Sequence, residues 1–188
     1  GVALAISAIL RPRFENLYLV NILGALSVYD LARYVGCEKV GIKWPNDVQV
    51  NFKKVSGILP EVVWNGDKLV GVVVGMGINV RNNFTGTELE GKAISLEEAV
   101  NHALDRTDLA AYVLDRIDYW YSQIDTVYLF ETWRDRLNML GKEVAVENVS
   151  GIAVDVKSDG SLRVENADGE VFTVMAGDVF VLTDEERD

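Results

Sequence analysis

The spacing of apolar residues predicts a strand and then a long helix at the start of the chain. Residues 2–10 form an almost unbroken apolar run, which is typical of a strand covered on both faces. Between residues 17 and 35 apolar side chains recur at helical spacing, and Gly36 follows as a helix stop. A short β-like stretch at 39–43 then leads into the turn Trp44-Pro-Asn-Asp47.

The next part of the chain predicts a group of strands. They are expected over residues 48–52, 55–63 and 68–74. The first two meet at a polar connection around Lys53-Lys54, and Asn65-Gly66-Asp67 joins the last two as a hairpin, because Asn-Gly accepts positive φ. The strand ends in Gly75-Met-Gly-Ile-Asn79, and residues 81–91 are rich in Asn and Gly, which indicates a surface loop.

Helices are predicted after this loop, and short strands after the helices. Ser95 with Glu98 forms a capping box, a second helix starts near Thr107, and a third covers 128–140 before the stop at Gly141. Five short strands then follow, with Asp-Gly turns between some of them, over 144–146, 152–156, 162–164, 171–174 and 179–182. The spacing of these strands indicates a small barrel.

The pattern as a whole predicts an α+β fold. We expect a mixed or mainly antiparallel sheet with helices on one face, followed by a small SH3-like β-barrel. The domain boundary falls near Gly141, which gives a domain over 1–140 and a small barrel domain over 141–188. The last residues, 183–188, read as a charged, mobile tail.

Composition narrows the class of protein. Of 188 residues, 49% are apolar and 25% charged, which is typical of a chain that folds around a core. The net charge of −11 argues against a nucleic-acid binder and against anionic membranes. One cysteine, Cys37, excludes an internal disulfide, and no apolar run is long enough for a membrane span. We therefore expect a cytoplasmic protein that binds neither nucleic acid nor membrane.

A few residues next to the predicted turns and strand ends are candidates for chemistry. Lys43 follows an apolar strand and precedes a Trp-Pro turn, so it can serve as a fixed cation for a carboxylate or phosphate, although a strand-end lysine is usually a solvated surface residue. Gly57 lies within an apolar strand, and Gly75 and Gly77 at the end of another, where a ligand can approach the backbone. With the amide of Asn79, these residues indicate a pocket for an anionic small molecule.

Three motifs in register give the sequence a family resemblance. Lys43-Trp-Pro-Asn-Asp47, Lys54-Val-Ser-Gly-Ile-Leu59 and the segment Gly75–Asn79 resemble the catalytic core of biotin–protein ligases, in that family's order and approximate spacing. The resemblance implies an ATP- and Mg²⁺-dependent enzyme that converts biotin to biotinyl-5′-AMP. The enzyme then transfers biotin to a lysine of a biotin carrier domain in a carboxylase. It also implies the fold stated above.

The resemblance assigns roles residue by residue. Lys43 matches the catalytic lysine that contacts the activated carboxyl group and the α-phosphate. Positions matching the biotin pocket are Lys43, Gly57, Ile58 and Gly75. Positions matching the nucleotide and phosphate site are Trp44, Asn46, Asp47, Gly77, Ile78 and Asn79. No residue is expected to bind metal directly, since Mg²⁺ arrives with ATP, near Asn79.

The sequence departs from the family pattern at two places. The family's Gly-Arg-Gly-Arg-type loop, which folds over biotin, has no counterpart here, so we expect an N-terminal fragment or a second chain to supply it. Leu182 stands where many relatives carry an arginine near the nucleotide phosphates. Relatives are often dimers, so the resemblance allows a homodimer. Two alternatives stay open: a non-catalytic module that holds a carrier domain, and a lipoate- or octanoyl-transferase-like relative.

Overall fold

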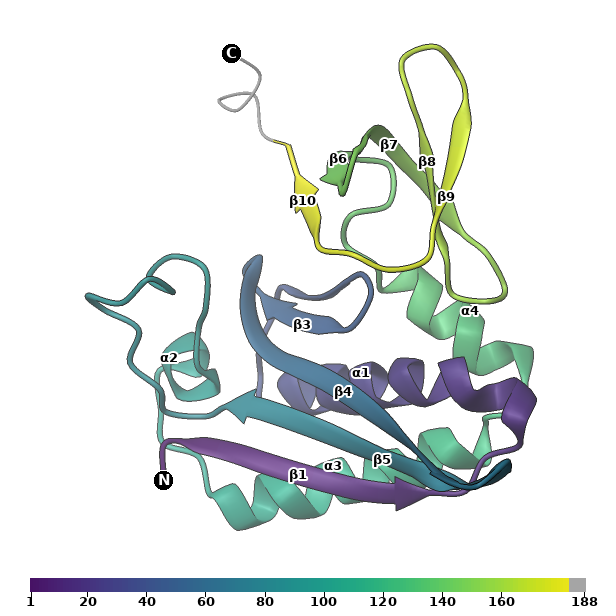
Figure 1. Ribbon diagram of the computed structural model, residues 1–188. Coiled ribbons are helices and arrows are strands. Elements are labelled where there is room, and N and C mark those ends of the chain that lie inside the picture. The colour runs from purple at the N-terminus through teal and green to yellow at the C-terminus, as the bar shows by residue number, and fades with distance from the viewer. Residues whose placement is uncertain (183–188) are drawn as a thin grey trace.

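A five-stranded antiparallel sheet forms the N-terminal part of the molecule. The computed structural model describes residues 1–182, so the predicted tail at 183–188 lies outside the described residues. The strands are β1 (Ala3–Leu10), β2 (Val40–Lys43), β3 (Asp47–Val50), β4 (Lys53–Asn65) and β5 (Lys68–Asn79). Their order in the sheet is β1-β5-β4-β3-β2 (Figure 1). The α+β fold and the antiparallel sheet predicted from the sequence are confirmed.

The expectation that the first strand is covered on both faces is wrong. β1 lies at an edge of the sheet, and its side chains alternate between the core and solvent. Leu4 and Leu10 are buried, whereas Ile9 is 66% exposed. The outer face of β1 carries Ala5, Ser7 and Ile9, and no helix covers it, so an apolar run here does not mean burial on both faces.

Helices cover one face of this sheet. They are α1 (Leu17–Tyr34), preceded by the short η1 (Phe14–Asn16), and α2 (Leu96–Val100), α3 (Arg106–Ser122) and α4 (Val127–Asp135). α1 packs across β2–β5, and α3 packs against α1 and also contacts β1 (Figure 1). The rings of Tyr34 and Tyr112 stack with centroids 4.1 Å apart, so the aromatic residues of α3 join helix to helix more than helix to sheet.

The described structure shifts two predicted boundaries. The turn between β3 and β4 lies at Asn51 and Phe52, which both have positive φ, so Lys53 and Lys54 belong to β4. α4 ends at Asp135 rather than at residue 140, because the following segment pairs with β2. The N–H of Ile42 donates to the carbonyl of Arg136 at 2.8 Å. The N–H of Asn138 donates to the carbonyl of Ile42 at 3.0 Å.

Five short antiparallel strands form the C-terminal unit. They are β6 (Glu143–Val146), β7 (Val149–Val156), β8 (Leu162–Glu165), β9 (Val171–Val174) and β10 (Val179–Val181), in the order β10-β6-β7-β8-β9. This confirms the predicted small SH3-like domain. A hydrogen bond at 2.8 Å from Trp44 Nε1 to the carbonyl of Gly160 links it to the first sheet. The boundary near Gly141 stays a prediction.

Two further predictions concern Cys37 and membrane spans. Cys37 is a free thiol and is buried, and burial raises its pKa. Of the helices within residues 1–182, none combines the length and apolar character that crossing a membrane requires.

Candidate functional site

One row of residues runs across the whole sheet on the face opposite the helices. Register pairs Lys43 with Asp47, Asp47 with Gly57, Gly57 with Gly77, and Gly77 with Ala5. Directly opposed residues of antiparallel strands lie on the same face. The row therefore leads from a stretch of bare backbone at β1, β5 and β4 to charged side chains at β3 and β2.

The bare part of this row forms an open floor. A Cβ atom added at Gly77 would meet no atom within 4 Å, and one at Gly75 would touch only the carbonyl of Leu59 at 3.4 Å. A Cβ at Gly57 would lie 3.2 Å from Lys54 Nζ and 3.4 Å from Asp47 Oδ1. The glycines thus leave room above the sheet, and a charged pair borders this room. We call Gly57, Gly75 and Gly77, with Ala5, the glycine floor.

An ion pair between Lys54 and Asp47 stands beside the glycine floor. Lys54 Nζ lies 2.7 Å from Asp47 Oδ1, and the Asp47 side chain is 16% exposed. Relative to β3, β4 has one extra residue between Lys54 and Ser56, which is a β-bulge. The bulge turns Lys54 to the face that Gly57 occupies. Backbone hydrogen bonds to Lys92 and from Ile94 hold Lys54 in place.

Lys43 points toward the C-terminal unit. Its Nζ lies 5.2 Å from the centre of the Phe180 ring. It also lines a cavity of about 450 Å³ between the β3–β4 turn, the segment after α4 and β10. Lys43 and Asp47 are opposed in the register of β2 and β3, so this cavity continues the row at its charged end.

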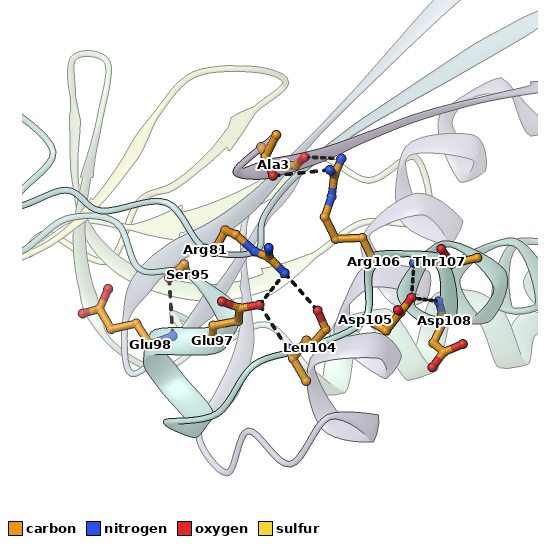
Figure 2. A network of polar contacts seen from close by, with 11 residues as sticks. Ala3, Arg81, Ser95, Glu97, Glu98, Leu104, Asp105, Arg106, Thr107 and Asp108 are labelled. Carbon is orange, nitrogen blue, oxygen red and sulfur yellow. Dashed lines mark hydrogen bonds and ion pairs between the residues drawn. The ribbon is translucent and has the colours of Figure 1, made fainter.

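Asn79 closes the glycine floor at the end of β5. Its Nδ2 donates to the carbonyl of Lys54 at 3.3 Å, and it shares a face with Gly77, two residues earlier. A polar network shown in Figure 2 fixes this end of the sheet. Arg81 donates to Glu97 Oε1 at 2.9 Å, and Arg106 donates to the carbonyl of Ala3 at 2.8 Å. The network therefore ties the neighbouring ends of β1 and β5 to α2 and α3.

Four of the predicted site residues do not present their side chains to this face. Ile58 and Ile78 are buried on the helix side of the sheet, so only their backbone can border the glycine floor. Trp44 is 1% exposed and bonds to Gly160. Asn46 is bound to Ile58 in both directions: its Nδ2 donates to that carbonyl at 2.7 Å, and its carbonyl accepts from that N–H at 3.2 Å. Trp44 and Asn46 therefore shape the turn between Lys43 and Asp47.

Sequence reasoning missed the position of Lys54. Lys54 belongs to the motif Lys54–Leu59, but regular strand alternation would place its side chain on the face of the sheet opposite to Gly57. Only the bulge brings it to the same face as Gly57. Phe180 and Lys142 were also missed, since they approach Lys43 only through the packing of the C-terminal unit. His102 lies just after α2 and is exposed. Within residues 1–182, no group of three or more His, Cys, Asp or Glu residues could hold a metal ion.

Two family models match the chain. The biotin/lipoate A/B protein ligase family matches residues 4–79, and the biotin protein ligase C-terminal domain matches residues 139–182. The fold and these matches therefore define a class of protein: a ligase of the biotin/lipoate type whose catalytic sheet is followed by a small C-terminal domain. The matched residues contain the glycine floor, the Lys54–Asp47 pair and β6–β10.

Relatives narrow this class further. A biotin–[acetyl-CoA-carboxylase] ligase of Paracoccus denitrificans is 29% identical over 188 residues, covering 92% of this chain and 77% of the relative. The biotin protein ligase of Aquifex aeolicus in complex with biotin and ATP matches with a TM-score of 0.82 and 27% identity, covering 97% of this chain and 79% of that one. The two family models and these relatives together support the biotin protein ligase family for this chain.

The match to other relatives is partial in length. The bifunctional ligase/repressor BirA of Bacillus subtilis is 27% identical over 186 residues, which is 90% of this chain. The chain spans 55% of that relative and 55% of its counterpart in Bacillus spizizenii, about half the length of each.

Proposed function

We propose that this chain is the catalytic part of a biotin–[acetyl-CoA-carboxylase] ligase. In the first step a biotin carboxylate oxygen attacks the α-phosphorus of Mg·ATP, and pyrophosphate leaves. In the second step the lysine amine of a biotin carrier domain attacks the acyl carbon of biotinyl-5′-AMP, and AMP leaves. Adenylation is required because a free carboxylate is a poor acyl donor.

The observation that carries the proposal is the row across the sheet, from the glycine floor to the two lysines. The floor offers backbone and open space, which suit the ring system of biotin lying against β4 and β5. Gly57, Gly75 and Gly77 would border it, together with the backbone of Ile58 and Ile78. This moves Gly77 and Ile78 from the nucleotide site implied by the resemblance to the biotin side, because the register pairs Gly77 with Gly57. Above Gly77 no side chain lies within 4 Å of a Cβ position, whereas the Lys54 ammonium group borders Gly57.

The charged end of the row supplies the electrostatics of the first step. Both reacting groups, a carboxylate and a phosphate, are anionic, so their approach requires preorganised cations. Lys54 is the cation beside the glycine floor, and Lys43 is the cation on the far side of Asp47. Asp47 holds Lys54 in place, and Asn79 offers its amide to the nucleotide. Mg²⁺ enters as part of the ATP substrate.

Other parts of the proposal concern the surroundings of the reaction. The biotin carrier domain of a carboxylase is the expected macromolecular partner, in line with the name of the Paracoccus denitrificans relative, a biotin–[acetyl-CoA-carboxylase] ligase. We place the protein in the cytoplasm, and the boundary between the ligase domain and the small C-terminal domain near Gly141.

A single-turnover experiment tests the proposal. Biotin and labelled Mg·ATP are mixed with the chain, and biotinyl-adenylate is separated and counted. Product that needs both biotin and Mg²⁺ supports the ligase. The same assay with Lys43→Ala tests the predicted catalytic lysine, for which we expect loss of adenylate with the fold intact. Wild-type turnover in that variant would remove Lys43 from the catalytic group.

A negative result has a defined meaning. If the folded chain forms no adenylate alone, a peptide carrying the family's glycine- and arginine-rich loop is added in trans. Recovery supports a ligase whose site is completed by that loop. Failure in both forms, while a biotin carrier domain still binds, contradicts the proposal and favours the non-catalytic module. Product with lipoate or octanoate in place of biotin would favour the transferase-like alternative.

A further inference from the structure

A short segment after α4 completes the edge of the sheet beside Lys43. β2 is the last strand in the order of the sheet and has only four residues. Residues 136–138, which we call the strap, pair with its outer edge at Ile42. The Ile42 N–H donates to the carbonyl of Arg136 at 2.8 Å, and the Ile42 carbonyl accepts from the N–H of Asn138 at 3.0 Å. Because Lys43 follows Ile42 directly, the strap holds the backbone from which the Lys43 side chain projects.

The strap also packs on the face of β2 that carries Lys43. Gly41 and Lys43 are two residues apart in one strand, so they share a face. A Cβ added at Gly41 would lie 2.7 Å from Asn138 Cβ, which means that Asn138 rests on the bare backbone of Gly41. Asn138 Nδ2 also donates to Gln49 Oε1 at 2.8 Å, and Gln49 is the register partner of Gly41. The strap therefore fixes β2 both at its edge and on its face.

An ion pair anchors the strap to the helices on the other side of the sheet. Arg136 Nη1 lies 3.0 Å from Asp30 Oδ1 of α1, and these side chains are 26% and 17% exposed. Asp30 Oδ2 accepts from Trp120 Nε1 of α3 at 2.9 Å, so both carboxylate oxygens have a donor. The Arg136 guanidinium also lies 4.3 Å from the centre of the Tyr29 ring, a distance at which a ring face attracts a cation. α1 and α3 together therefore set the position of Arg136.

We propose that Arg136 is a positioning residue for Lys43, held in place by Asp30. This inference rests on the proposed function, in which Lys43 is the catalytic lysine. The connection runs from the Asp30 carboxylate to the Arg136 guanidinium, along the strap to Ile42, and from there to Lys43. A cation stabilises developing charge only when it is preorganised, and a displacement of about 1 Å costs up to about 10²-fold in rate. The helices thereby set how Lys43 reaches into the site.

Native-state hydrogen exchange tests the anchor without any turnover. Arg136→Met removes the ion pair, so the strap should loosen and the protection factor of the Ile42 N–H should fall at least about tenfold. Arg116→Met is the matched control. The Arg116 side chain is 27% exposed, pairs with Asp115 at 2.6 Å and lies 4.8 Å from the centre of the Tyr119 ring, but its hydrogen bonds stay within α3. The control should leave Ile42 protection within about twofold of the wild type.

The amide of Val74, in the middle of β5, separates local loosening from a loss of global stability. β5 is paired on both sides, so this N–H exchanges only when larger parts of the sheet open. In Arg136→Met, the protection of Ile42 should fall by more than that of Val74. Equal falls at both amides, unchanged protection of Ile42, or an equal loss in Arg116→Met would overturn the inference.

Steady-state kinetics connect the strap to the reaction. In adenylation, Arg136→Met should lower kcat about tenfold and leave the KM for biotin within about twofold, because the glycine floor lies on β1, β4 and β5. Arg136→Lys keeps a charge for Asp30 and should recover most of kcat, whereas Arg116→Met should keep the kcat of the wild type. A raised KM for biotin with unchanged kcat would contradict the positioning role.

A double variant separates positioning from stability. Asp30→Asn combined with Arg136→Met removes the uncompensated carboxylate and keeps an acceptor for Trp120, so its stability to urea should recover toward that of the wild type. Its kcat should stay as low as that of Arg136→Met, because the strap is still without its anchor. Recovery of kcat together with stability would show that Arg136 matters only for the fold.

The failure of this inference and the failure of the proposed function give different results. If the wild type forms adenylate and Arg136→Met keeps full kcat, the positioning role fails and the ligase proposal stands. If Ile42 protection depends on Arg136 but the wild type forms no adenylate in any form, the anchoring of the strap stands and the ligase proposal fails. Loss of both Ile42 protection and kcat in Arg136→Met, with an active wild type, supports both.

Discussion

Gly77 is the residue whose substitution tests the glycine floor most cleanly. A Cβ at this position meets nothing within 4 Å, so Gly77→Val fits the fold but fills the space above the sheet. We expect biotin affinity to fall at least about tenfold, since two methyl groups displace the ligand from contact with the backbone. Calorimetry with biotin measures the affinity, and thermal unfolding should shift by no more than about 2 °C.

Ile9→Val is the matched control for this prediction. Ile9 lies on the same face of the sheet, farther along β1, and is 66% exposed. The control should bind biotin as the wild type does. Unchanged affinity in Gly77→Val would show that the ligand binds elsewhere.

Substitution of Lys54 gives a second prediction at the scale of a single residue. Removing its charge in Lys54→Met leaves Asp47 without its partner and the glycine floor without a cation. We expect adenylate formation to fall by about 10²- to 10³-fold, the usual cost of losing one preorganised electrostatic contact. Single-turnover assays measure the rate, with Lys68→Met at the far end of β5 as a control that keeps full activity. Full activity in Lys54→Met would leave Lys43 as the principal cation.

These two residues show what the sequence could establish about the site. Glycines at 57, 75 and 77 stood out because strand glycines are uncommon, and the register brings 57 and 77 side by side. Lys54 did not stand out in the sequence, because the direction of its side chain depends on a bulge that leaves no signature in the sequence pattern. Alternation along a strand predicts a face only where the pairing is regular.

At the scale of elements, the contact between α1 and the sheet depends on Gly24. A Cβ there would lie 2.9 Å from Ile58 Cγ2 and 3.3 Å from Val74 Cγ1. Gly24→Val overpacks this contact, and we expect it to lower the free energy of unfolding by about 1–3 kcal/mol. Urea unfolding measures the change. Ala111→Val, on the exposed side of α3, introduces the same β-branched side chain and should cost less than about 1 kcal/mol. Equal losses of unfolding free energy in Gly24→Val and Ala111→Val would show that α1 packs loosely against the sheet at Gly24.

The start of α3 carries a pH-dependent contribution to stability. Hydrogen bonds from the backbone N–H groups of Asp108 and Thr107 hold the pKa of Asp105 below its usual range. A lowered folded pKa means that this contribution is present above pH 4 and is lost as the pH falls through the folded pKa. Asp105→Asn keeps an N-cap but removes the charge, so its stability should depend less on pH below 4.

Acid titration of urea unfolding measures this difference. Asp105→Ala, which also removes the cap, should be less stable than Asp105→Asn at pH 7. Parallel acid curves for the wild type and Asp105→Asn would contradict the assignment.

Elements defined by local signals were predictable, and those defined by distant partners were not. The helix start at Ser95 and the hairpin turn at Asn65-Gly66 depend on neighbouring residues, and both are confirmed: the Ser95 hydroxyl accepts from the N–H of Glu98, and Asn65 pairs with Lys68. The end of α4 depends on pairing with β2, almost a hundred residues earlier, and no local stop signal marks Asp135. The exposure of one face of β1 likewise depends on distant elements, since the helices cover only the other face of the sheet and Leu59 of the central strand β4 is exposed as Ile9 is.

At the scale of the whole molecule, Trp44 joins the two units. Its indole is 1% exposed, and Nε1 donates to the carbonyl of Gly160 at 2.8 Å. Trp44→Phe removes the donor and leaves this carbonyl without that partner. We expect a loss of about 1–2 kcal/mol in the free energy of unfolding. Urea unfolding measures it, and Trp64→Phe, at a position 46% exposed, should change little. An unchanged free energy of unfolding in Trp44→Phe would mean that water replaces the Trp44 N–H as the donor to the Gly160 carbonyl.

The two-part architecture was predictable from the change in pattern near Gly141, but its consequence for the site was not. Short strands and Asp-Gly turns indicate a small barrel without saying which surface it meets. Docking of the C-terminal unit brings Phe180 of β10 to Lys43, and Lys142, just before β6, to Phe52. Only the folded arrangement reveals that cavity.

The place of β1 at the sheet edge also bears on the order in which the sheet forms. β4 and β5 are joined by a tight turn, whereas the paired residues of β1 and β5 are between 62 (Leu10 with Val72) and 76 (Ala3 with Asn79) positions apart in the sequence. Closing so long a loop costs more conformational entropy than closing a hairpin. We therefore expect β1 to join last on folding and to open first in native-state hydrogen exchange, before β4 does. The glycine floor, which needs Ala5 beside Gly77, would then be complete only in the final folding step.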